Sequence, residues 1–434
     1  MRHTLPGVSA ISYRRGDPLA EYDRWRRLGG GGERLLLVDF ELRQYWLPNA
    51  PPVSLTALYC LSGERLQVAV SGQALVADAG APRSQYRAWT ARHGLASWEP
   101  GMPLELSPVT VPKPWGREIW YSGVEQRGVC SFACGGGHSP IPWLQAVVPD
   151  SGLGVAAEPL VLLKILDPRP QPVVGDLYFE LHEEKREVYV VTGINPVAWP
   201  GGQGGIRLGF DPRRLADYPD QQAFRQAYLR AVQAYEAVRR ELDGLAGKGL
   251  APGPEQLEQE RFLREAMNDF TYLQPVAVGD VVTVPLRVPH SLQHGVRTIE
   301  FQTPVYERKI LSFAQQVQTQ DHWDTAEAVQ SMLLEAPPQP ALPVLQQGEG
   351  LRVERVVDFP DFEVRRITLQ GVARLDLEAG QHYALLMVVA GSLRLGGAAF
   401  RAEQAMLLPR GWAGVLESAQ AAQPLVLLWA VPRR

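Results

Sequence analysis

Short runs of apolar residues, separated at close intervals by Gly, Pro and Asp, make up most of this chain. Examples are LQVAVSG, PLVLLKILD, REVYVVTG, DVVTVPL and ALLMVVAGSLRL. Runs of this length that are rich in β-branched residues and bounded by turn residues are typical of strands in antiparallel sandwiches and barrels. The pattern therefore predicts a mainly β protein.

One segment, from residue 211 to about residue 270, departs from this pattern. It is rich in Ala, Arg, Gln and Leu, and its large apolar side chains recur near helical spacing: Phe224, Tyr228, Leu229, Val232, Tyr235 and Val238. Such spacing places them on one face of a helix, where they can pack while the opposite face stays in water. A second helical piece, PEQLEQERFLREAMNDF, follows the break at GLAPG. We predict a helical insert between two β halves, with the apolar stripe as core packing.

The chain has 434 residues and a hydrophobic composition of 45%, so it is too long for one core and should divide into several domains. Residues 1–108 contain strand-like runs without a chemical motif, and we predict a β-rich extension of unknown role. Residues 109–334 are predicted to form a domain that contains the helical insert. The Pro-rich and Gln-rich stretch 335–350 is expected to be a linker. Residues 351–434 are expected to form a small C-terminal β domain.

The charge distribution restricts the class of ligand. The net charge is -4 and the basic residues are dispersed, which argues against partners such as nucleic acid or an anionic membrane. No apolar run is long enough to cross a bilayer, and the N-terminus lacks the hydrophobic core of a secretory signal. Three cysteines, an odd number, argue against a disulfide framework. We expect a cytoplasmic protein that binds a small molecule, and a homo-oligomer is left open.

The run GDLYFELHEEKREVYVVTG, which starts at residue 175, places Glu180, His182 and Glu187 among aromatic and β-branched residues. Residues two apart on a strand point to the same side, so Glu180 and His182 can converge on one point. Glu187 follows the expected turn at EEKR, on the returning strand. The three side chains could hold a metal ion. Alternatively, the two glutamates pair with Lys185 and Arg186 on a solvated face, and the spacing alone does not decide between these interpretations.

A second run, GDVVTVPLRVPHSLQHG, adds His290 to this set. The spacings G-x4-E-x-H-x4-E-x5-G and G-x5-P-x4-H resemble the two signature motifs of the cupin superfamily, with Glu180 where the first His usually stands. In that fold the two motifs lie on neighbouring strands of a small barrel. The resemblance implies that Glu180, His182, Glu187 and His290 bind one divalent metal ion. His294 lies four residues further on and is expected to face solvent.

Within the cupins, the chain resembles the class I mannose-6-phosphate isomerases over about residues 110–434. The segments that carry the resemblance are KPWG at residues 113–116, LVLLKILDPRPQP, Lys185-Arg186-Glu187 with the aromatic strand after it, and GDVVTVPLRVPHSL. The C-terminal segments FEVRRITLQG, LMVVAGSLRLGG and AMLLPRG resemble the last cupin domain of that family, which carries no metal. The implied fold is therefore a pair of cupin domains with a helical insert.

The resemblance implies a zinc-dependent aldose-ketose isomerase that acts on a sugar phosphate. The metal would polarise the open-chain carbonyl, so that the C2 proton can move to C1 through an enediol. The position of a family glutamate falls on Glu300, which would be the base or a hydroxyl-positioning group. Lys185 and Arg308 are implied for anion binding and charge stabilisation.

The chain departs from the family pattern in its metal ligands and its loops. The family has Gln where this chain has Glu180, and a second carboxylate would blunt the Lewis acidity of the ion and suit Mn²⁺ or Fe²⁺ as well as zinc. The loop after His182 is shortened to two glutamates. Two alternatives follow: a cupin oxygenase that binds iron through His182, His290 and Glu187, and a non-catalytic sugar-binding or regulatory protein.

Overall fold

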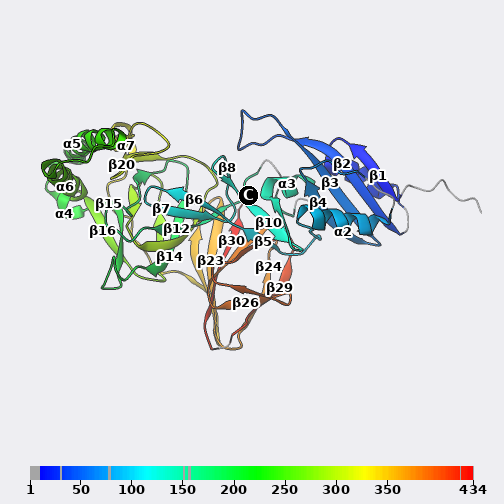
Figure 1. Cartoon of the computed structure of the whole chain (residues 1–434). Coiled ribbons are helices and arrows are strands. Elements are labelled where there is room, and N and C mark those ends of the chain that lie inside the picture. The colour runs from blue at the N-terminus through cyan, green and yellow to red at the C-terminus, as the bar shows by residue number, and fades with distance from the viewer. Residues whose placement is uncertain are drawn as a thin grey trace, which may run out of the picture. The chain divides into compact units, whose positions relative to one another are not determined.

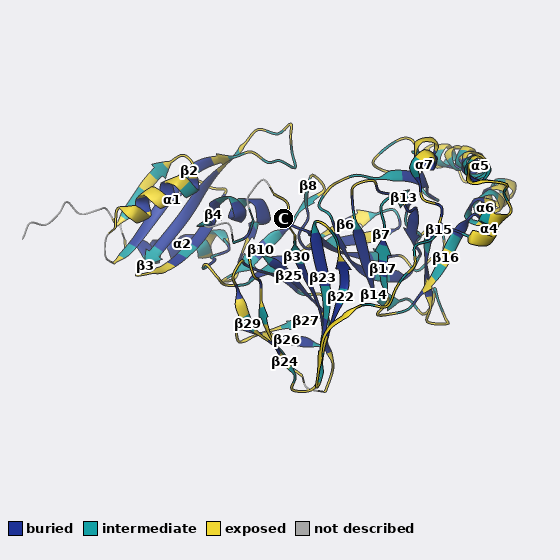
Figure 2. Ribbon diagram, turned by 180° about the vertical axis from the view of Figure 1, so that it is seen from behind, coloured by how far each residue is buried: buried dark blue, intermediate teal, exposed yellow. Residues whose placement is uncertain are grey.

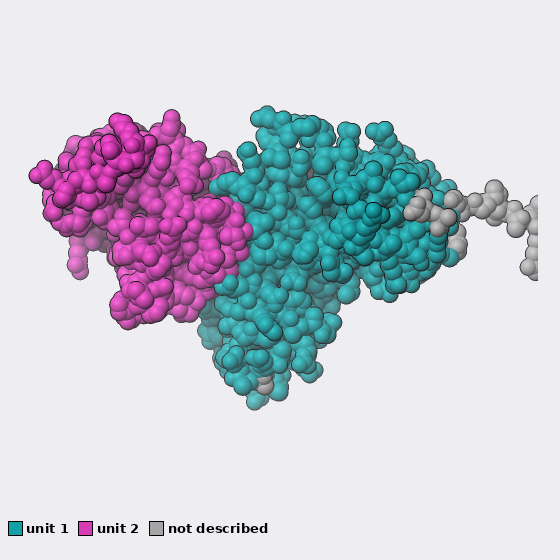
Figure 3. Space-filling view, viewed as in Figure 1, with its two compact units in different colours: residues 1–109, 120–162, 342–434 teal, residues 110–119, 163–341 magenta. Residues whose placement is uncertain are grey.

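The computed structural model describes residues 10–29, 32–76, 80–149, 152–154, 158–420 and 422–433. These ranges contain thirty strands and seven α-helices, which confirms the prediction of a mainly β protein. The chain forms two compact units (Figure 3). Unit 1 comprises residues 1–109, 120–162 and 342–434, and unit 2 comprises residues 110–119 and 163–341.

Unit 2 contains two sheets whose inner faces share one core. The strand order is β17-β14-β19-β12-β7-β6 in the six-stranded sheet and β16-β15-β18-β13-β20 in the five-stranded sheet. The core cluster takes Tyr189 and Val284 from the first sheet, and Ile206 and Ile310 from the second. Burial of alternate side chains between two sheets is the packing that the short apolar runs predict. The strands are β6 (Val109–Lys113), β7 (Gly116–Trp120), β12 (Leu162–Pro168), β13 (Phe179–Leu181), β14 (Glu187–Ile194), β15 (Gly204–Phe210), β16 (Thr271–Val276), β17 (Val281–Val284), β18 (His290–Leu292), β19 (Val296–Gln302) and β20 (Lys309–Ser312).

The helical insert packs against the outer face of the five-stranded sheet. It consists of α4 (Pro212–Ala216), α5 (Gln221–Gly247) and α6 (Pro254–Asn268), which lie together beside β15 and β16 in Figure 1. Asp220 caps α5 by accepting a hydrogen bond from the backbone N–H of Ala223. The predicted stripe of α5 is buried against Phe179 and Leu311 of the sheet and against α7 (Thr325–Ser331), and only Leu229 is half-buried. Exposed residues cover the outer sides of α4 and α6 (Figure 2).

The N-terminal part of unit 1 is a four-stranded sheet with helices, in the order β1-β2-β3-β4. Its elements are β1 (Ile11–Arg15), α1 (Pro18–Arg27), β2 (Glu33–Leu42), β3 (Val53–Ser62), β4 (Arg65–Ser71) and α2 (Pro82–His93). Strand β1 runs parallel to β2, while β3 runs antiparallel to both of its neighbours. Tyr86 and Trp89 of α2 pack against apolar residues of this sheet and form one core with them. The predicted β-rich extension therefore also contains helices.

The C-terminal part of unit 1 joins a nine-stranded sheet, β11-β10-β5-β28-β25-β30-β23-β22-β21, to a four-stranded sheet, β24-β29-β26-β27. Apolar side chains fill the space between them, including Trp412 and Trp429. The elements are β5 (Leu104–Ser107), β8 (Val124–Glu125), β9 (Gly128–Val129), β10 (Ser131–Cys134), β11 (Gly137–Pro140), α3 (Ile141–Val147), β21 (Val344–Gly348), β22 (Leu351–Asp358), β23 (Phe362–Leu369), β24 (Arg374–Glu378), β25 (Ala384–Ala390), β26 (Ser392–Leu395), β27 (Ala398–Arg401), β28 (Ala405–Leu408), β29 (Ala413–Ser418) and β30 (Leu425–Pro432).

The division into units differs from the predicted domain boundaries in two places. Residues 120–162, which we predicted inside the domain 109–334, belong to unit 1, because β10 pairs with β5 and β5 pairs with β28. The predicted linker 335–350 contains β21, an exposed edge strand that pairs with β22. The sequence pattern did not predict this strand, because the stretch begins with several prolines and has no apolar face. No described helix has both the length and the apolar character needed to cross a membrane.

Candidate metal centre

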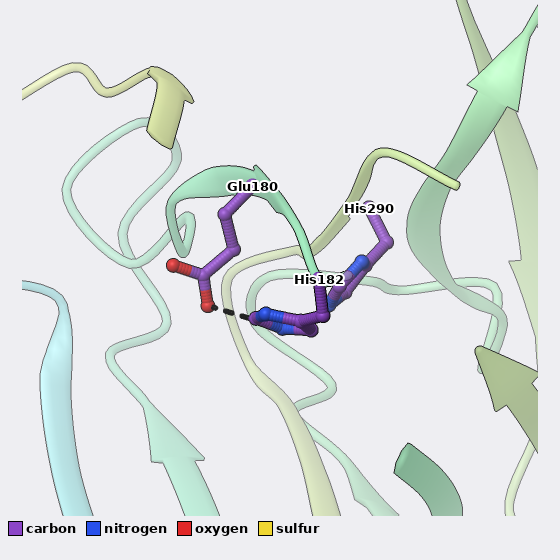
Figure 4. A group of neighbouring side chains, drawn as sticks. All are labelled: Glu180, His182 and His290. Carbon is purple, nitrogen blue, oxygen red and sulfur yellow. Dashed lines mark ion pairs between the residues drawn. The ribbon is translucent and has the colours of Figure 1, made fainter. Parts of the chain in front are cut away.

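Strand pairing in the five-stranded sheet of unit 2 brings the two predicted motifs together. Strands β13 and β18 are antiparallel neighbours, and Glu180 lies directly opposite His290. Side chains at opposite positions of such a pair lie about 5 Å apart on the same face. His182 follows Glu180 by two positions and therefore projects to that face as well. Figure 4 shows the three side chains converging from the two segments.

The ligand-type atoms of Glu180, His182 and His290 lie close enough to share one ion. One such atom from each residue lies within 4.8 Å of the other two. The Nε2 atom of His182 is 3.9 Å from Oε1 of Glu180, and the two imidazole centroids are 5.1 Å apart. Ligand atoms around a tetrahedral zinc ion are about 3.4 Å apart. A small inward movement of these side chains would therefore complete a coordination shell.

Glu187, the fourth predicted ligand, comes from the facing six-stranded sheet. Its Oε1 lies 3.5 Å from Nε2 of His182, and its Oε2 lies 3.2 Å from Nε2 of His290. The hydroxyl of Tyr189 donates a hydrogen bond of 2.8 Å to the same Oε2. The structure thus places Glu187 beside both imidazoles of the group formed by Glu180, His182 and His290.

Both imidazoles are oriented as metal ligands require. The Nδ1 atom of His182 lies 3.0 Å from the carbonyl oxygen of Glu307, and Nδ1 of His290 lies 3.1 Å from that of Val288. A carbonyl only accepts hydrogen bonds, so each Nδ1 carries a hydrogen, and Nε2 is the atom of each ring that faces the carboxylates. Burial lowers the pKa of His182 and the nearby charge of Lys185 lowers it further, which favours the neutral ring.

The donor set fits a divalent transition metal. The Nε2 atom of His182 is buried and makes no hydrogen bond of good geometry with any described residue, although Glu187 Oε1 is 3.5 Å away. An unpartnered buried nitrogen is costly unless a ligand satisfies it. Two imidazole nitrogens and two carboxylates bind Zn²⁺, Mn²⁺ and Fe²⁺ well. The centre therefore suits a divalent ion.

Each carboxylate of the centre has a cation of its own. The Nζ atom of Lys185 is 2.6 Å from Oε1 of Glu187, and Nη1 of Arg308 is 3.3 Å from Oε2 of Glu180. Burial raises the pKa of Glu187, but Lys185 and the two imidazoles together outweigh burial, so the pKa lies well below its usual value. For Glu180, burial also raises the pKa, and Arg308 together with His182, Lys185 and His290 lowers it below its usual value. Both glutamates are therefore ionised at neutral pH.

Glu300, the predicted base, lies on the same face of the six-stranded sheet as Glu187. It is opposite Tyr189 across β14 and β19, and its side chain is 1% exposed. The Nζ atom of Lys164 lies 3.3 Å from its Oε2, while its Oε1 is buried without a hydrogen-bond partner in the described ranges. Burial raises the pKa of Glu300 well above its usual value, although Lys164 opposes this.

Lys164 begins a chain of buried charges that the sequence analysis missed. Its Nζ atom also lies 3.7 Å from Glu118, and Glu118 is 3.0 Å from Nζ of Lys113. All three side chains are at most 11% exposed. The sequence feature that could have indicated these ion pairs is Lys164, in the middle of the apolar run LVLLKILD. A charged side chain on a buried strand requires an oppositely charged partner.

The environment of His294 differs from the expectation that it faces solvent. Its Nδ1 lies 2.7 Å from Oδ1 of Asp176, and its ring stacks on Trp199 at a centroid distance of 4.8 Å. Its side chain is 12% exposed. The expectation was wrong because Trp199, almost a hundred residues away in sequence, covers the ring. His294 takes no part in the four-residue centre.

Glu307 holds the shortened turn that follows His182, a role that no motif or spacing along the chain indicates. Its Oε2 accepts hydrogen bonds from the backbone N–H groups of Glu183, Glu184 and Lys185, at 2.9, 3.0 and 3.4 Å. Its carbonyl oxygen is the one that orients His182. The side chain and the backbone of this one residue thus fix both the ligand and the turn behind it.

We predict that Glu307→Ala weakens zinc binding about 10-fold, because loss of the carboxylate releases the turn behind His182, while the backbone carbonyl that accepts from His182 remains. Calorimetric zinc titration measures this, and thermal unfolding in chelator verifies that the fold remains. Glu327→Ala is the matched control, because Glu327 is an exposed glutamate that pairs with Lys309 of the same unit. Wild-type zinc affinity in the Glu307 variant would show that the hold of this carboxylate on the turn does not support metal binding.

No protein-family model and no curated protein sequence matches the chain. Solved structures do match it. The mannose 6-phosphate isomerase from Bacillus subtilis is 14% identical, with a TM-score of 0.53, and the match covers 76% of this chain and 99% of that one. A variant of the phosphomannose isomerase from Salmonella typhimurium is 11% identical, with a TM-score of 0.53. This match covers 76% of this chain and 100% of that one.

A zinc-bound mannose 6-phosphate isomerase is also similar, at 12% identity and a TM-score of 0.54, with 76% of this chain and 100% of that one covered. At such low identity these likenesses concern the fold. The chain has the cupin fold of the mannose-6-phosphate isomerases, in divergent form. The resemblance that the motifs indicated is therefore confirmed at the level of the fold.

Proposed function

We propose that the protein is a divalent-metal-dependent aldose-ketose isomerase that acts on a sugar phosphate. The observation that carries this proposal is the convergence of Glu180, His182 and His290 on one point, with Glu187 beside both imidazoles and Glu300 on the same face of the sheet as Glu187. The likeness of the fold to mannose 6-phosphate isomerases supports the same class of reaction. Zinc is the ion we propose, since one of these similar structures is zinc-bound.

Several residues of the chain have separate roles in an enediol mechanism. When bound, the divalent ion would polarise the carbonyl of the open-chain sugar and make its C2 proton acidic. Glu300 takes this proton at Oε1, its unpartnered oxygen, and returns it to C1. Lys164 holds the other oxygen of Glu300 and so orients the carboxylate. Lys185 and Arg308 place two positive charges beside the ligands, where they stabilise an anionic substrate and the developing enediolate.

The test is incorporation of solvent deuterium into mannose 6-phosphate by the zinc-loaded chain in D₂O, with the metal content of the same sample measured. Exchange at C2 together with formation of the ketose phosphate would support the proposal. Binding of sugar phosphate by metal-loaded protein without exchange would favour a non-catalytic sugar-binding protein instead. Turnover that consumes oxygen would favour a cupin oxygenase. A chain that binds no divalent ion would overturn the proposal.

A further inference from the structure

Glu180 uses its two carboxylate oxygens for different partners. Its Oε1 faces the imidazole of His182, at 3.9 Å from Nε2, and is the oxygen available to an ion. Its Oε2 accepts a hydrogen bond of 3.3 Å from Nη1 of Arg308. A neutral amide at this position would likewise present one oxygen to a metal and keep its other group for the protein.

The guanidinium of Arg308 is held on several sides. Its Nη2 donates a hydrogen bond of 2.6 Å to Oγ1 of Thr319. It also lies over the ring of Tyr178, at 4.5 Å from the centroid, and within 5.9 Å of the ring of Tyr306. The side chain is 11% exposed. An arginine keeps its charge at any physiological pH, so this cation is a permanent part of the centre.

The positive charges change the electrostatics of a site with two carboxylate ligands. Two carboxylates alone would neutralise a divalent ion and reduce its Lewis acidity. Glu187 and Glu180 contribute two negative charges, and Lys185 and Arg308 contribute two positive charges within hydrogen-bonding distance of them. Opposite charges at such separations cancel strongly in a buried site. An ion between the two sheets would therefore keep most of its own charge.

We propose that Glu180 and Arg308 act together as one neutral metal ligand. Arg308 is a positioning residue in this arrangement: it holds Oε2 of Glu180, directs Oε1 to the ion and cancels the charge of the carboxylate. The pair takes the place of a neutral amide ligand and preserves a preference for zinc over the harder ions that two uncompensated carboxylates would attract. This inference rests on the metal centre of the proposed function.

A double-mutant cycle with calorimetric zinc titration tests the pair. Glu180→Gln leaves an unpaired cation beside the ion, and we expect zinc affinity to fall about 10-fold to 100-fold. Arg308→Met leaves an uncompensated carboxylate, and we expect the affinity to rise about tenfold, because an attractive charge is no longer cancelled. In the double variant, a neutral amide beside a neutral side chain should bind zinc about as tightly as the wild type does. A purely structural role of Arg308 would not produce tighter binding.

Arg297→Met is the matched control, because Arg297 is an arginine of the same unit whose ion pair is with Asp167, at 2.6 Å. Zinc affinity in this variant should be unchanged. Weaker zinc binding by Arg308→Met, or a double variant that binds zinc as weakly as Glu180→Gln does, would overturn the inference. If the wild-type chain binds zinc and the zinc affinities of the variants change as expected, but the wild type does not isomerise sugar phosphates, only the proposed function fails. If it binds no divalent ion, both fail.

Discussion

Replacing His290 with alanine is expected to abolish stoichiometric zinc binding and, with it, isomerase activity. The Nε2 atom of His290 is oriented by the carbonyl of Val288 and reaches the shared point from β18, so its loss leaves one imidazole in the centre. Changing groups that merely orient a ligand costs about 10-fold to 100-fold in metal affinity, and loss of a ligand itself should exceed that. Zinc titration and metal analysis of the purified variant measure the effect.

His294→Ala is the control for this variant. His294 is also an imidazole of the same unit, half-buried, but it pairs with Asp176 and lies outside the centre. Circular dichroism and thermal unfolding in chelator should show that both variants fold. Retention of one tightly bound zinc ion per chain in the His290 variant would contradict the assignment of the centre.

Glu300→Gln is expected to reduce the rate of C2 proton exchange about 10²-fold to 10⁴-fold, which is the usual contribution of a positioned general base. Zinc content should stay at the wild-type level, because Glu300 is not among the four ligands. An amide of nearly the same shape retains the packing at this position, where the side chain is 1% exposed. Deuterium incorporation at C2, followed by mass spectrometry or NMR, measures the rate.

Glu118→Gln separates the loss of a base from the loss of an ion pair. Lys164 lies 3.3 Å from Glu300 and 3.7 Å from Glu118, so each variant removes one of its two carboxylate partners. We expect the Glu118 variant to keep most of its exchange activity. Equal losses in the two variants would show that Glu300 acts through Lys164 and would exclude it as the base.

Local periodicity accounts for much of what could be predicted of the fold. The stripe that contains Phe224, Tyr228 and Tyr235 has helical spacing in the sequence and forms the buried face of α5. The run REVYVVTG, with its β-branched residues, forms β14, which lies between β17 and β19 in its sheet. Strand β21 was missed because an exposed edge strand has no apolar face to reveal it. Helix α2 was missed because its Tyr86 and Trp89 offered too short a pattern to distinguish from strands.

The candidate centre was predictable only in its residue types and spacings. Glu180 and His182 share a side because they are two apart, a property of any strand. Their meeting with His290 depends on the register of β13 with β18, which joins segments more than a hundred residues apart. The partners Arg308 and Glu307 follow from the same pairings, and Arg308 reaches Glu180 across a sequence separation of 128.

Residue types and their spacing were enough to predict which side chains could act as ligands, which strands carry them and which helix face is buried, because these properties repeat with the geometry of the local backbone. The pairing of the charges depends on the folded chain: Lys185 pairs with Glu187, Arg308 with Glu180 and Lys164 with Glu300. Electrostatic interactions depend on distance and burial, which no spacing along the chain encodes. The charge that the centre presents to an ion is therefore a property of the folded protein.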